Sequence, residues 1–198
     1  MHRARLWETL PALREQVPAM ALKSTIHRVE LSIADIDRGY YHDHSLTLAR
    51  HPSETEERMM VRLLAFAMHA DPALAFGAGL SDVEEPDLWL RDDTGAIDLW
   101  VEVGLPDERR LRRACGRAAR VVAISYGRNA ALWWRQLPSL ERLDRLSVLE
   151  LPVAATQELA ALAQRTMRLQ ANANEGLWWI GNEAGAASIG PIVRKQAG

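Results

Sequence analysis

The sequence predicts an α/β domain (α+β in the wider sense), with a mixed sheet flanked by helices. Stretches with the two-residue alternation of strands are interspersed with stretches of helical periodicity along the whole chain. The 198 residues, 48% of them hydrophobic, suffice for a substantial core. The one cysteine excludes an internal disulfide and any zinc site built on cysteine pairs. No apolar run approaches the roughly 20 residues that cross a bilayer, so we expect no membrane partner and a cytoplasmic location.

The chain divides into two unequal parts. Residues 1–19 form a short amphipathic stretch that Pro11 and Pro18 interrupt. We expect this stretch to be an N-terminal extension that is disordered or not native. Residues 20–198 contain no repeat, low-complexity tract or linker, and we expect them to form a single domain.

The first half of this domain predicts a hairpin followed by a helix. Residues 24–33 alternate, with Val29 and Leu31 on the same face, as in a half-buried strand. A turn over 35–39 leads into a partner strand over 40–48. Residues 53–56 form a capping box, which predicts a helix that runs to about His69.

The second half predicts further strands alternating with helices. Pro106, followed by acidic residues, marks a helix start. Glycines between alternating stretches mark the turn of a last hairpin. The expected elements are strands over 87–91, 97–103, 121–125 and 147–151, helices over 106–119 and 156–170, and a hairpin over 176–189.

The hairpin over 87–103 carries the most informative side chains. A two-residue loop at Thr94 and Gly95 places Asp87 opposite Glu102 on one face, with Trp89 opposite Trp100 and Arg91 opposite Asp98. Directly opposed carboxylates are destabilising unless something holds them together. A divalent cation such as Mg²⁺ or Mn²⁺, which takes oxygen ligands, is one explanation. The alternative is that the strand end is solvated or that the register differs by one residue.

These residues resemble a known nuclease motif. Pro86 and Asp87, a strand, a turn, and then Glu102-Val103-Gly104 are similar to the core of PD-(D/E)xK nucleases. The longer strings KSTIHRVELSIADIDRGYY, LTLARHPSETEERMMVRLLAFA, EPDLWLRDDTGAIDLWVEVGLPDE and ACGRA resemble the YaeQ family over roughly residues 20–190. The resemblance implies a bacterial protein with a compact, restriction-endonuclease-like α/β fold.

The resemblance also implies roles for individual residues. Asp87 matches the metal-binding aspartate of the motif and Glu102 its second acid, while Glu57 is the candidate for a third, supporting acid on the preceding helix. Gly104 stands where the motif has lysine. Because no lysine lies between Lys23 and Lys195, a nearby lysine cannot replace it.

Arginines on the next helix are candidates for binding phosphate. Arg109, Arg113 and Arg117 recur on one side of the helix. The acidic stretch 82–87 lies on the other side of the hairpin in sequence, so the fold is expected to bring an acidic and a basic patch together. Guanidinium groups bind phosphate well, but they stay protonated and cannot serve as a proton-accepting base. A solvated helix face is the alternative explanation.

Two functions follow from these expectations. One is a Mg²⁺- or Mn²⁺-dependent phosphodiesterase or nuclease-like protein, with Asp87 and Glu102 as metal ligands and catalytic residues, supported by Glu57. The other is a catalytically inactive nuclease fold that serves as a nucleic-acid or protein interaction or regulatory module. The acid pair favours the first function, and the missing lysine favours the second.

Overall fold

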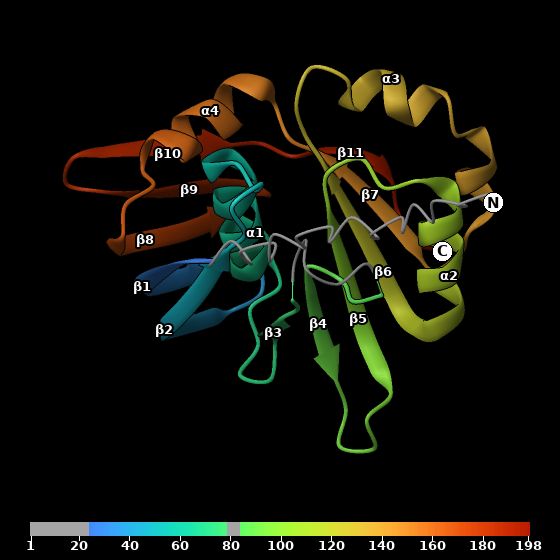
Figure 1. Ribbon diagram of the computed structural model, residues 1–198, viewed down its shortest axis with the longest axis horizontal. Coiled ribbons are helices and arrows are strands. Elements are labelled where there is room, and N and C mark those ends of the chain that lie inside the picture. The colour runs from blue at the N-terminus through green and yellow to red at the C-terminus, as the bar shows by residue number, and fades with distance from the viewer. Residues whose placement is uncertain (1–23, 79–83) are drawn as a thin grey trace, which may run out of the picture.

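The computed structural model describes residues 24–78 and 84–198, which form two β-sheets with helices between and beside them (Figure 1). The mixed α/β class expected from the sequence is confirmed. The extension expected over residues 1–19 lies outside the described residues. Within the described part of the chain, no helix is long and apolar enough to cross a membrane.

The first sheet has five strands in the order β10-β9-β8-β1-β2. β1 pairs parallel to β8, and the other neighbours pair antiparallel. Alternate residues of β1 are buried, as the sequence predicts, because only one face of the sheet covers the core. The hairpin expected near the N-terminus and the one expected over 176–189 are both confirmed. The strands are β1 (Thr25–Asp35), β2 (Tyr40–Arg50), β8 (Thr166–Asn174), β9 (Leu177–Asn182) and β10 (Gly185–Ile189).

The second sheet has six strands in the order β11-β7-β6-β5-β4-β3. Its centre is parallel, because β5, β6 and β7 run in the same direction, while β4 and β11 are antiparallel to their neighbours. Helices join the parallel strands, as such crossings require. The strands are β3 (Ala75–Phe76), β4 (Leu88–Arg91), β5 (Ile97–Val103), β6 (Ala118–Ser125), β7 (Leu146–Glu150) and β11 (Ile192–Lys195).

Helix α1 (Glu56–Met68) fills the space between the two sheets (Figure 1). Its apolar side chains join one core with residues of both sheets, including Leu31 of β1 and Val101 of β5. Helix α2 (Glu108–Arg117) covers the opposite face of the second sheet, where Trp100 and Leu111 belong to a smaller core. The remaining helices are α3 (Ala130–Arg135), the 3₁₀ helix η2 (Pro138–Arg142) and α4 (Val153–Ala161).

The helix expected over 156–170 is wrong beyond its first half. Helix α4 ends at Ala161, and β8 begins at Thr166. Within β8, Met167, Leu169 and Ala171 are buried while the residues between them are exposed. This period of two belongs to a strand with one covered face, and the pairing of β8 with β1 outweighs the helical propensity of the segment.

Two local expectations are corrected by backbone geometry. The β4–β5 loop has three residues, 93–95, rather than two, because the Asp92 amide donates to the Ala96 carbonyl. Gly95 within it has a φ of 84°. The register therefore shifts near the loop, so that Arg91 pairs with Ile97 and not with Asp98. Helix α1 is capped by Thr55, whose side chain accepts from the Arg58 amide, two residues after the expected cap at Ser53.

An arginine closes the C-terminal end of α1. Arg38 donates to the carbonyls of Ala67 and Ala70, at 3.0 and 3.2 Å, and to the buried Asp35 carboxylate. Burial, together with the nearby charges of Arg38 and Arg120, lowers the pKa of His69 at this helix end from 6.5 to about 4. The His69 imidazole is therefore neutral at neutral pH.

This histidine is expected to make the fold sensitive to mild acid. In the unfolded chain His69 takes up a proton below pH 6.5, but in the folded chain only near pH 4, so stability is lost as the pH falls between these values. Replacing His69 with glutamine should remove about 1–3 kcal/mol of this loss, which urea unfolding at pH 7.5 and pH 4.5 measures. Equal pH dependence in wild type and variant would contradict the assignment.

Candidate functional site

The β4–β5 hairpin brings Asp87 and Glu102 together at one end of the second sheet. Leu88 pairs with Val101, and the Asp87 amide donates to the Val101 carbonyl at 3.0 Å, which sets Asp87 beside Glu102. The two side chains are almost fully enclosed, at 2% and 3% exposure. The two acids are therefore close at the strand end, which is not solvated, but they do not share one face as expected: α1 binds Asp87, and α2 on the other side of the sheet binds Glu102.

Arginines from α1 hold the Asp87 carboxylate. Arg58 Nη2 lies 2.6 Å from Asp87 Oδ1, and Arg62 Nε lies 3.7 Å from the same oxygen. The second oxygen, Oδ2, accepts the Val103 amide at 2.7 Å. Asp87 thereby ties the helix to the hairpin through guanidinium and amide donors.

Glu54, just before α1, completes this side of the site. Its carboxylate accepts from Arg58 Nη1 at 2.9 Å and from Arg62 Nη1 at 3.0 and 3.1 Å. Glu54, Arg58 and Arg62 follow one another at intervals of four residues, so they lie on the same side of the start of α1. The Arg62 side chain is only 2% exposed, and burial of this kind is tolerated because the charge is paired on both sides.

Glu102 takes its partners from the opposite face of the sheet. Its Oε1 accepts from Trp100 Nε1 at 2.6 Å and from Arg110 Nε of α2 at 2.8 Å. Burial raises the pKa of Glu102, the neighbouring Asp87 charge adds to the rise, and the bonds from Arg110 and Trp100 oppose it. A buried acid with a raised pKa beside a second acid is typical of functional sites.

We call this group the carboxylate–arginine cluster. It lies at the carboxyl ends of the parallel strands, where α/β sheets usually bind ligands. Its members come from α1, the hairpin and α2, so it depends on the packing of all three. They are Glu54, Arg58, Arg62, Asp87, Glu102 and Arg110.

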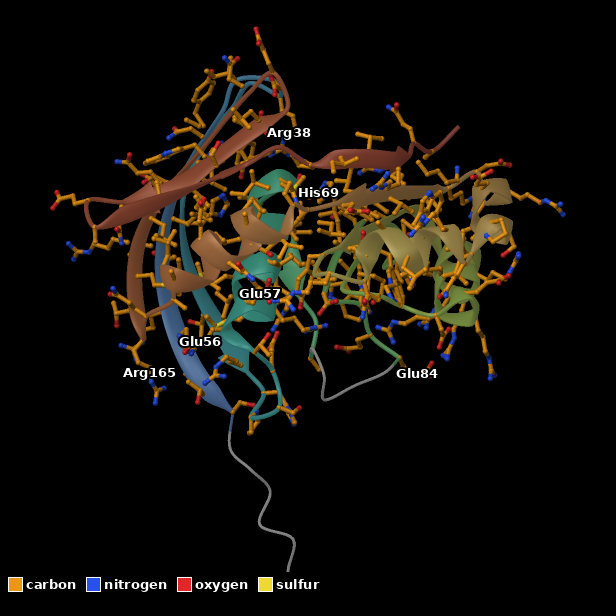
Figure 2. The ribbon with its side chains drawn as sticks, turned by 90° about the horizontal axis from the view of Figure 1, so that it is seen from above. Arg38, Glu56, Glu57, His69, Glu84 and Arg165 are labelled. Atoms are coloured by element: carbon orange, nitrogen blue, oxygen red, sulfur yellow. The ribbon has the colours of Figure 1, made fainter. Side chains whose placement is uncertain are left out.

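Glu57 does not join this cluster. Its Oε1 accepts the Thr156 hydroxyl of α4 at 2.6 Å, so the side chain is bound to α4. Figure 2 shows Glu57 near the middle of the molecule, well apart from Glu84 beside α2. Glu54 occupies the position that the sequence assigned to Glu57. Its spacing of four from Arg58 and of eight from Arg62 is the signal that identifies it.

Tyr126 is a further residue of this region that the sequence did not single out. It follows β6 directly, and burial raises the pKa of its phenol to about 12, with the charges of Arg58, Glu57 and Asp87 acting on it. The phenol therefore stays protonated and can donate a hydrogen bond. The clue in the sequence was its place at the carboxyl end of a buried strand.

The arginines of α2 meet the acidic segment before β4, as expected. Arg113 binds the Glu84 carboxylate with both terminal nitrogens, and Arg117 reaches the Glu84 carbonyl at 3.5 Å. The Arg117 guanidinium also lies over the Trp100 ring, 5.3 Å from its centre. Arg109 is exposed at the start of the helix. The two patches thus partly neutralise each other at the surface.

The arrangement does not fit a divalent cation as it stands. No group of three or more His, Cys, Asp or Glu side chains in residues 24–78 and 84–198 could hold a metal ion. Asp87 Oδ1 and Glu102 Oε1 already accept from arginines, and Asp87 Oδ2 accepts the Val103 amide. Gly104 has a φ of 116°, so a lysine at the position the nuclease motif requires would be strained.

Comparisons with known proteins converge on one family. The family model described as "YaeQ protein" matches residues 20–191. The chain is 48% identical over 166 residues to the "Uncharacterized protein YaeQ" of Escherichia coli (strain K12). The matched region covers 83% of this chain and 92% of that protein.

Solved structures match as well. The crystal structure of the YaeQ protein from Xanthomonas axonopodis pv. citri superposes with a TM-score of 0.85 at 50% identity, covering 88% of this chain and 99% of the other. The YaeQ protein from Pseudomonas syringae gives 0.84 at 36% identity, covering 87% and 97%.

We expect replacement of a buried arginine of the cluster to lower the free energy of unfolding far more than replacement of an exposed arginine. Arg62→Ala leaves the buried Glu54 and Asp87 short of a partner and should destabilise the fold by about 3 kcal/mol or more. Arg112→Ala, which removes an exposed helix pair with Glu108, is the matched control and should cost less than about 1 kcal/mol. Chemical unfolding of both variants measures the difference. Similar losses would show that the cluster does not contribute to stability.

Proposed function

This chain belongs to the YaeQ family, and from that premise we propose that it is a cytoplasmic nucleic-acid-binding module on a PD-(D/E)xK nuclease-like fold. In this proposal the acid pair of the nucleases is retained but is held by arginines. The helix α2 arginines then bind phosphate groups of the nucleic acid. The protein acts by binding and not by cleavage.

The bonding of Asp87 and Glu102 carries the proposal. Each accepts a charge-assisted hydrogen bond from an arginine, at 2.6 Å from Arg58 and 2.8 Å from Arg110. In the cluster, three carboxylates face three guanidinium groups, so the charge that a cation would neutralise is already balanced. Arginine cannot accept a proton at neutral pH, so these groups stabilise charge without supplying the base that the motif lysine is expected to assist.

The topology around the acid pair supports the nuclease-like assignment. Pro86 and Asp87 open a short antiparallel strand, Glu102 ends the next strand, and that strand continues into a parallel pair with β6. Helices pack on both faces of this sheet. This order of elements is the one that the resemblance of the sequence to the PD-(D/E)xK core implies.

Surface arginines on α2 supply the phosphate contacts. Arg109 and Arg113 are exposed, and the Glu84 partner of Arg113 is itself more than half exposed. Exposed ion pairs contribute about 0–1 kcal/mol, so a phosphate group can replace Glu84 at little cost. Arginine then offers the same two-pronged geometry to phosphate.

A second function, Mg²⁺- or Mn²⁺-dependent phosphodiester hydrolysis, is favoured by one observation. Burial raises the pKa of Glu102 most, and the nearby Asp87 charge adds to the rise. Such a pair gains from a cation between or beside its members. For this function Arg58 and Arg110 must first release the two acids.

Salt dependence tests the binding proposal. The double variant Arg109→Gln/Arg113→Gln should lower the slope of log affinity against log salt by about 0.9 per arginine for duplex DNA, because each phosphate contact releases a counterion. Arg28→Gln/Arg168→Gln removes the same charge from the outer face of the first sheet and should leave the slope nearly unchanged. Fluorescence anisotropy with labelled single- and double-stranded DNA and RNA measures both. Equal effects of the two double variants, or no salt-dependent binding, would contradict the proposal.

A metal titration separates the two functions. If arginines occupy the acid pair permanently, millimolar Mg²⁺ or Mn²⁺ should leave the unfolding temperature unchanged and labelled nucleic acids uncleaved. A metal-linked rise in unfolding temperature that Glu102→Gln abolishes, together with cleavage that the same variant abolishes, would instead support the hydrolase. Circular dichroism of the Glu102→Gln variant checks that its fold is intact.

A further inference from the structure

A pocket of about 320 Å³ opens on the second sheet, beyond the C-terminal end of α1. Its floor is made by Leu99, Val122 and Leu149 of β5, β6 and β7, which point to the same face of the sheet. His69 forms the wall at the helix end. Figure 2 shows His69 beside Arg38, away from Glu57 at the other end of α1. The pocket is therefore separate from the carboxylate–arginine cluster, which lies toward the carboxyl ends of the strands.

The polar side chains around this pocket are strongly biased toward positive charge. Arg120, Arg145 and Lys195 line it, and the described residues that line it include no Asp or Glu. Three cations that line one pocket without a carboxylate repel one another, and water screens this repulsion only in part. Nearby anions are the usual way to offset it.

The contacts of these cations leave their charges unneutralised. Arg145 Nη1 donates to the carbonyls of Cys115 and Ala118 at 3.3 Å, and Lys195 Nζ donates to the Gln196 carbonyl at 3.2 Å. Within the described parts of the chain, no ion pair with a carboxylate involves Arg120, Arg145 or Lys195. Carbonyl partners fix the direction of a guanidinium or ammonium group but do not neutralise its charge.

The helix end and His69 add two favourable features. The C-terminal end of a helix normally repels anions, but Arg38 covers the carbonyls of Ala67 and Ala70 at this end. His69 Nε2 is a buried atom without a hydrogen-bond partner. Unsatisfied buried polar atoms are rare in folded proteins, and a ligand group is one partner that satisfies them.

We propose that this pocket binds a small phosphate monoester, with the phosphate group held by Arg120, Arg145 and Lys195. The three positive charges suit a group that carries close to two negative charges at neutral pH. The volume lies in the range of pockets that enclose small organic ligands and exceeds what a phosphate ion alone fills. The apolar floor covers the body of the ligand.

Ser147 adds a neutral contact for the same group. Its Oγ accepts the Ala197 amide at 3.0 Å, which leaves the hydroxyl proton available to donate to a phosphate oxygen. The pocket thus combines cations for the charge, a hydroxyl donor for orientation and an apolar surface for the rest of the ligand. The combination is independent of the proposed nucleic-acid function.

Calorimetric titration with ribose 5-phosphate, inorganic phosphate and ribose tests the proposal. Ribose 5-phosphate should bind with a defined stoichiometry of one, inorganic phosphate more weakly, and ribose not detectably. Arg120→Gln and Lys195→Gln, measured separately, should each weaken binding of ribose 5-phosphate about tenfold or more, because each removes a charge-assisted contact. Arg28→Gln, a charge-matched change on the other sheet, should leave it unchanged. The His69 imidazole resonances should shift on binding.

Three results would overturn the phosphate-monoester site, and one further result would identify the source of the ligand. Equal binding of ribose and ribose 5-phosphate, no binding by the wild-type chain at millimolar ligand, or unchanged binding in both pocket variants would overturn the assignment. A 5′-phosphorylated dinucleotide that binds more tightly than ribose 5-phosphate, and loses this advantage without its 5′-phosphate, would identify a nucleic-acid end as the source of the monoester. The Arg109→Gln/Arg113→Gln variant should bind ribose 5-phosphate normally, so failure here and failure of the nucleic-acid proposal are distinguishable.

Discussion

The Asp87 side chain, enclosed at the junction of helix and hairpin, is the constraint on which the rest of the site depends. A carboxylate out of reach of water is costly unless charged donors surround it. Its donors are the Arg58 guanidinium from α1 and the Val103 amide from the neighbouring strand. Because α1 also packs against the first sheet, this one carboxylate fixes the helix that both sheets share. The positions of Glu54 and Arg62 follow from it.

In the proposed function, the fold keeps the acidic pair of the nuclease motif while changing its chemistry. A metal ion carries a concentrated positive charge and dissociates when its concentration in solution is low. A guanidinium group brings diffuse charge on a fixed tether, so the pair is neutralised at all times. Trp100 adds a neutral donor to Glu102, and Tyr126 adds a phenol that stays protonated. These groups can orient and stabilise an anion, and none of them accepts a proton readily at neutral pH.

The sequence predicted those features that depend on local pattern. The alternation of β1, the start of α2 near Pro106 and the closeness of Asp87 to Glu102 were predicted correctly, because a period or a turn determines each of them; the shared face of the two acids was not. The features that failed depend on distant partners. Residues 166–170 pair with β1, and nothing near them in sequence indicates that partner. The choice of Glu57 as the third acid rested on the resemblance alone, and only the packing of α1 shows that Glu54 meets Arg58 and Arg62 while Glu57 meets Thr156 of α4.

The parallel pairing of β1 with β8 has a consequence for how the chain assembles. His27 Nδ1 lies 2.8 Å from the Gln164 carbonyl oxygen, 137 residues away in sequence. As the protein leaves the ribosome, the β1–β2 hairpin emerges long before its central partner, and its β1 edge stays open until most of the polypeptide has been made. Contacts of such long range are slow to form because the intervening loop must close first. The five-stranded sheet is thus completed late in synthesis. Until then, the open β1 edge of the nascent chain can pair with a non-native strand.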